Sequence, residues 1–175
     1  MNPIFHGSPR RQGGVMLLEA LIGLMIFSVG ILAMIGMQAA AFSAASDAKF
    51  RADAAAYAND IISKIWMNID RTTPTTTIAS LNSFQYNLAG TDCAFSGGPA
   101  DPGNTTLAAW VSAVTDTSGL LGATASMQQI AVGVVANPAL NPTSAAEMNR
   151  VTVTLCWQAP QDTRSRKHQV ITYVY

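Results

Sequence analysis

The feature that most constrains this chain is a run of 27 consecutive residues without Asp, Glu, Lys or Arg, which extends from Ala20 to Ser46. Leu, Ile, Met, Val, Phe and Ala dominate the run. A helix of this length is about 40 Å long, whereas the hydrocarbon core of a bilayer is roughly 30 Å thick. The run therefore predicts a transmembrane helix.

The segment that precedes the apolar run predicts which end of the chain stays inside the cell. Residues 1–14 contain Arg10 and Arg11 and no acidic residue, and positively charged flanks remain in the cytoplasm. We expect the remainder of the chain to be exported. A signal peptide or a plain membrane anchor is the alternative interpretation. An ordinary signal peptide is cut at small residues after its apolar run. Here the run passes into alanine-rich sequence with Gln38, Phe42 and Asp47, and the helical pattern continues, so nothing indicates that the apolar segment is removed.

Glu19 lies near the beginning of the apolar segment, directly after Leu17 and Leu18. A lone acid within a bilayer costs about 2.5–3.5 kcal/mol on insertion scales, and such residues are usually functional and have a partner. The alternative is a carboxylate at the membrane interface that favours the positive end of the helix dipole. Glu19 alone does not distinguish a functional carboxylate with a partner from an interfacial carboxylate at the start of the helix.

Glu19 belongs to a longer pattern that resembles the class III signal of type IV pilins and type II secretion pseudopilins. The pattern comprises Arg10, Arg11, Gly14 and Glu19, followed by the long apolar helix. The resemblance implies that a prepilin peptidase cuts after Gly14 and methylates the new N-terminus at Val15. It also makes Glu19 the glutamate found at the fifth mature position. Val15 departs from the family, where Phe or Met is more frequent.

The resemblance gives this pattern a physical rationale. An amine freed at Val15 and a Glu19 carboxylate on a neighbouring subunit would attract each other strongly in an apolar bundle, where an unpaired charge is costly.

The resemblance also divides the chain into three expected parts. These are a cleaved leader at 1–14, a transmembrane and filament-core helix at 15–46, and a periplasmic head at 47–175, which includes the second half of the helix.

The hydrophobic periodicity of the exported part predicts an α+β fold. We expect one long helix over 15–70, whose second half packs on a C-terminal antiparallel sheet through an apolar stripe at three- and four-residue steps. The members of this stripe are Ala54, Tyr57, Ala58, Ile61, Ile62, Ile65, Trp66 and Ile69. The strands are predicted at 128–135, 150–157 and 169–175, with a short one at 84–88.

The remaining segments of the head are predicted from turn and helix signals. A short helix is expected at 107–114, a turn region at 96–104, and loops at 72–80 and 159–168. Pro74 is taken as the end of the long helix, because proline disfavours helical geometry at the preceding residue.

The chain has two cysteines, Cys93 and Cys156, which the predicted topology places outside the cytoplasm. An oxidising compartment favours a disulfide between them over free thiols. We expect no metal and no cofactor, because His168 would be the only histidine after processing, and we expect it in an exposed loop. We therefore expect no enzymatic activity. Ten basic residues balance ten acidic ones, so no specific nucleic-acid binding is expected.

The apolar helix is most similar to that of PilV-type minor pilins, through the segments Leu17–Gly23 and Ser28–Gln38. This implies a subunit that initiates pilus assembly and supports adhesion and twitching motility. The implied partners are other minor pilins, the major pilin, a tip adhesin, prepilin peptidase, the inner-membrane assembly platform and the lipid bilayer. Its implied location is the inner membrane and then the pilus, near its tip. The alternatives are a type II secretion minor pseudopilin and a monomeric membrane-anchored periplasmic binding module.

Overall fold

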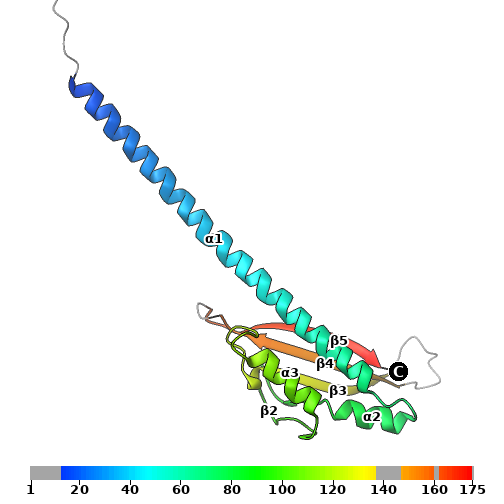
Figure 1. Cartoon of the computed structure of the whole chain (residues 1–175). Coiled ribbons are helices and arrows are strands. Elements are labelled where there is room, and N and C mark those ends of the chain that lie inside the picture. The colour runs from blue at the N-terminus through cyan, green and yellow to red at the C-terminus, as the bar shows by residue number, and fades with distance from the viewer. Residues whose placement is uncertain (1–12, 137–146, 160–161, 175) are drawn as a thin grey trace, which may run out of the picture. The chain divides into compact units, whose positions relative to one another are not determined.

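The computed structural model describes residues 13–136, 147–159 and 162–174 (Figure 1). The chain divides into two compact units, Met1–Asp47 and Ala48–Tyr175. The boundary falls within the first helix, α1 (Gly13–Asn68). The long helix expected from the sequence is therefore present, and it ends two residues before the predicted Asp70.

The described residues of the first unit form the N-terminal part of α1. The apolar run contains no proline, and its Ala, Leu and Met residues are strong helix formers. From Gly14 to Ala45 every described side chain is exposed. This part of the helix is apolar on all sides, which is typical of a helix that a membrane or other helices surround.

The second unit contains an antiparallel sheet of three strands in the order β3 (Gln128–Ala136), β4 (Glu147–Trp157) and β5 (Arg166–Val174). The register is regular, with Val153 opposite both Ile130 and Val170. On β4 the predicted apolar face, Val151, Val153, Leu155 and Trp157, is buried. Thr154 and Cys156 on the opposite face are buried as well, so the half-buried alternation expected from the two-residue period holds only at the N-terminal end of this stretch. The α+β class and the antiparallel C-terminal sheet are therefore confirmed.

One face of this sheet shares a hydrophobic core with the C-terminal part of α1 and with α3 (Thr105–Thr115) (Figure 1). Trp110 of α3 is fully buried, and its Nε1 donates a hydrogen bond to the Tyr57 carbonyl at 2.9 Å. The buried members of the predicted α1 stripe are Ala54, Ala58, Ile61, Ile65 and Ile69.

Trp66 does not belong to this core, although the stripe included it. Its side chain is exposed, and the Arg71 guanidinium lies 5.1 Å from the centroid of its ring. At this distance a cation over an indole ring is attracted to it. The end of α1 therefore directs this ring toward solvent and Arg71.

The prediction of a loop at 72–80 is wrong, because this segment contains α2 (Pro74–Asn82). Proline at the first helical position is favourable, since its missing N–H is not needed there. The Thr73 hydroxyl accepts a hydrogen bond from the Thr76 N–H at 3.1 Å, and the Thr76 hydroxyl accepts one from the Thr73 N–H at 3.0 Å. Pro74 therefore starts a helix, in addition to following the end of α1.

We expect Thr73→Ala to lower the free energy of unfolding by about 0.5–2 kcal/mol, since the helix loses its N-terminal cap. Urea unfolding of the detergent-solubilised protein, followed by tryptophan fluorescence, measures this change. Thr75→Ala is a matched control, because Thr75 is exposed on the same helix and has no capping role. Equal losses in the two variants would contradict the capping role of Thr73.

The prediction of a strand at 84–88 is also wrong. Tyr86 forms an isolated bridge with Ile130, and the strands β1 (Ala89–Thr91) and β2 (Ala94–Ser96) form a separate hairpin further along the chain. Both residues of the intervening turn, Asp92 and Cys93, have positive φ angles of 51° and 66°. Positive φ at both positions is typical of the tight turn that suits two twisted antiparallel strands.

The loop expected at 159–168 is shorter than predicted, because β5 begins at Arg166. His168 therefore lies on a strand opposite Leu155 and is half-buried, which corrects its placement in an exposed loop. Asp162 precedes the strand and accepts a hydrogen bond from Arg166 Nε at 2.7 Å. This bond holds the pKa of Asp162 below its ordinary value. Residues 160, 161 and 175 lie outside the described part of the chain.

Candidate functional site

Gly14, Val15 and Glu19 lie in the first turns of α1, in the first unit. Residues four apart in a helix share one face, so the structure places Val15 and Glu19 on the same side. Both side chains are exposed. None of the described residues forms a hydrogen bond or an ion pair with the Glu19 carboxylate, and Arg10 and Arg11 lie outside the described part. Glu19 is therefore available to a partner from outside this part of the chain.

The surface around Glu19 is a continuous cover of large apolar side chains. From Val15 to Met37 the large apolar side chains are between 43% and 76% exposed. By length and composition, this helix is able to cross a membrane. A surface of this kind marks contact with lipid or with other proteins, because exposing it to water is unfavourable.

The structure joins Cys93 and Cys156 in a disulfide, with their Cα atoms 5.7 Å apart. Cys156 is fully buried on β4, and Cys93 is 8% exposed in the turn between β1 and β2. Phe95 and Met127 pack around the pair. The disulfide therefore attaches the β1–β2 hairpin to the central strand of the sheet.

Gln128 supports the buried end of this disulfide. Its side-chain Nε2 donates to the Cys156 carbonyl at 2.9 Å, and its Oε1 accepts from the Cys156 N–H at 3.3 Å. Gln128 is fully buried, and a buried amide is costly unless it is hydrogen-bonded. The amide thereby fixes the backbone of β4 where the disulfide meets it.

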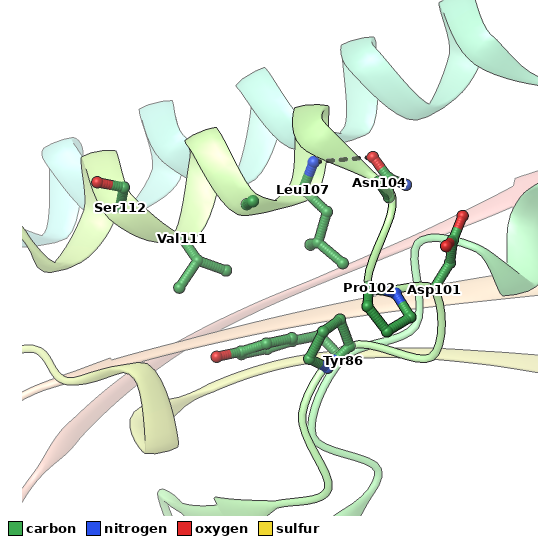
Figure 2. Close-up of a pocket in the computed structure, with 9 residues that line it drawn as sticks. Tyr86, Asp101, Pro102, Asn104, Leu107, Val111 and Ser112 are labelled. Carbon is green, nitrogen blue, oxygen red and sulfur yellow. Dashed lines mark hydrogen bonds between the residues drawn. The ribbon is translucent and has the colours of Figure 1, made fainter.

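The second unit also contains a pocket that the sequence analysis did not select, between α3 and the segment 99–104 (Figure 2). Its lining residues come from three separate segments, and their types form no recognisable spacing. The pocket could therefore be found only from the folded chain. No group of three or more His, Cys, Asp or Glu side chains suited to a metal ion occurs among the described residues.

Comparisons with protein-family models, curated proteins and solved structures find no match for this chain.

Proposed function

We propose that this protein is a minor subunit of a type IV pilus that helps initiate assembly and joins the complex near the tip. It would be made as an inner-membrane precursor, cut after Gly14, and added to the filament through its N-terminal helix. Its disulfide-bonded head would then face the periplasm and later the filament surface, where it would support adhesion and twitching motility.

The observation that carries this proposal is the position of Glu19 on α1. A carboxylate without a described partner lies on a helix that is apolar on all sides, five positions after Gly14 and on the same face as Val15. An isolated carboxylate in an apolar environment is unfavourable, whereas an opposite charge at close range offsets that cost. The amine that cleavage would create at Val15 of an adjacent subunit supplies such a charge.

The surfaces of the two units agree with separate roles in assembly and in contact with partners. Lipid would cover the exposed apolar surface of α1 before assembly, and neighbouring helices would cover it afterwards. The second unit has its own core of buried residues from α1, α2, α3 and the sheet. The first unit would therefore serve assembly, while the second carries the surface that other pilins or an adhesin contact.

The test is to shear filaments from the surface of wild-type cells and to detect this protein with an antibody against its head. We expect it in the sheared fraction together with, and much less abundant than, the major pilin. Deleting its gene should reduce the number of surface pili without changing type II secretion of a reporter protein. Detection in membranes alone, while filaments form normally, would contradict the proposal, and a selective loss of secretion would identify a pseudopilin.

A further inference from the structure

The pocket beside α3 has a volume of about 330 Å³ and lies entirely in the second unit. Figure 2 shows the Tyr86 ring on one side, with Leu107 and Val111 of α3 opposite and Pro102 closing one end. Leu107 is 1% exposed, while Ala108 and Ser112 lie at the open side. The pocket is therefore a slot between an aromatic ring and an aliphatic helix face.

The walls of this slot are held by hydrogen bonds. The backbone of Tyr86 is fixed to Ile130 of β3 by bonds of 3.0 and 3.1 Å. Asn104 accepts a bond from the Leu107 N–H at 3.0 Å, which caps α3, and donates one to the Ser83 carbonyl at 3.1 Å. Because both sides are anchored, the slot exists without a ligand, as is usual for binding pockets.

The lining is mainly apolar, with a few polar groups that lack partners. Among the described residues, no hydrogen bond involves the hydroxyl of Tyr86 or of Ser112. Only one of the two carboxylate oxygens of Asp101 accepts a bond from them, from the Gly103 N–H at 2.8 Å. Aromatic rings stack favourably against one another in an offset or edge-to-face geometry. This lining suits a flat apolar ring that has polar atoms at its edge.

Asp101 is the one charged residue among the described residues that line the slot. From Thr72 to Asn149, the stretch that supplies every lining residue, the chain contains Asp92, Asp101, Asp116 and Glu147 and no Lys or Arg. Asp101 itself lines the slot and is exposed. Complementary charges favour the correct partner and disfavour like-charged ones, so a ligand with a positive group next to its ring fits best.

We propose that this slot is a docking site for an extended segment of a partner protein, in which an aromatic side chain enters the slot and an adjacent Lys or Arg pairs with Asp101. Aromatic anchors in small pockets are typical of the few residues that dominate protein interfaces. The inference depends only on the second unit, and it holds whether or not the protein belongs to a pilus.

The test uses the full chain in phosphatidylcholine nanodiscs and the fluorescein-labelled peptide Ser-Gly-Lys-Trp-Gly-Ser, with binding measured by fluorescence anisotropy. After subtraction of empty nanodiscs, we expect saturable binding. A peptide with alanine in place of tryptophan, or with glutamate in place of lysine, should bind at least fivefold more weakly. No saturable binding, or equal binding of the three peptides, would overturn the proposal.

Two variants with matched controls assign the binding to this slot. Ala108→Phe fills the slot and should weaken binding at least tenfold, whereas Ala109→Phe adds the same ring at an exposed position outside the lining and should not. Asp101→Asn keeps the bond to Gly103 but removes the charge and should weaken binding about fivefold, while Asp116→Asn should not. Unchanged tryptophan fluorescence shows that each variant is folded, and equal binding by Ala108→Phe and wild type would overturn the assignment.

Discussion

Replacing Glu19 by alanine is expected to lower the amount of this protein in sheared filaments at least tenfold while leaving its amount in the membrane unchanged. Alanine makes the apolar helix easier to insert, because a carboxylate at the membrane costs about 2.5–3.5 kcal/mol. The same change removes the charge that would attract the Val15 amine of a neighbouring subunit. Membrane insertion and filament entry should therefore respond differently to a single substitution.

Three further variants separate charge from shape at this position. Glu19→Gln keeps the size but removes the charge and should behave like alanine, whereas Glu19→Asp should retain part of the wild-type incorporation. Ser28→Ala is the matched control, because Ser28 is a polar residue on the same helix whose hydroxyl donates a hydrogen bond to the Leu24 carbonyl at 2.7 Å. Wild-type incorporation of Glu19→Gln would contradict the charge pairing.

Removing the disulfide should produce the largest loss of stability in the head. The bond joins residues separated by 63 positions, and closing a loop of that length stabilises the folded state by about 4 kcal/mol in the chain-entropy description. We therefore expect the Cys93→Ala, Cys156→Ala double variant to unfold at a clearly lower urea concentration than the oxidised protein. Tryptophan fluorescence measures the transition.

The reduced wild-type protein is the control for the double variant. Both lack the covalent link, but only the double variant lacks the sulfur atoms packed beside Phe95 and Met127. Most of the loss should therefore occur on reduction of the wild type, and the substitutions should add a smaller amount. Identical stability of the oxidised and reduced proteins would show that the disulfide does not support this fold.

The elements that could be predicted from the sequence are those with long, regular patterns. The uncharged apolar run identified the N-terminal part of α1, and repeated three- and four-residue spacing identified its C-terminal part. Alternation of apolar and polar residues identified β4. Their ends differ from the prediction by a few residues at most. The periodic patterns are reliable because each residue that faces the core must be apolar.

The elements that could not be predicted depend on local geometry. Helix α2 depends on the Thr73 cap and on Pro74 at its first position, and a proline indicates either the end of one helix or the start of another. The three-residue strands β1 and β2 are too short to show a period, and their pairing depends on the turn at Asp92 and Cys93.

Of the two candidate sites, one could be predicted from the sequence and the other could not. Gly14, Val15 and Glu19 are close together in the sequence, so their spacing alone defines a site. The slot beside α3 combines Tyr86, whose backbone is bonded to Ile130 of β3, with Leu107 and Val111 of α3. Contacts of this kind between distant segments are visible only in the folded chain.

The most direct test of the proposed function is the intact mass of the protein purified from membranes of cells that contain prepilin peptidase. We predict a chain that begins at Val15, lacks residues 1–14 and carries one added methyl group, and we predict that Gly14→Ala blocks this shortening. A protein that still begins at Met1 would contradict the account.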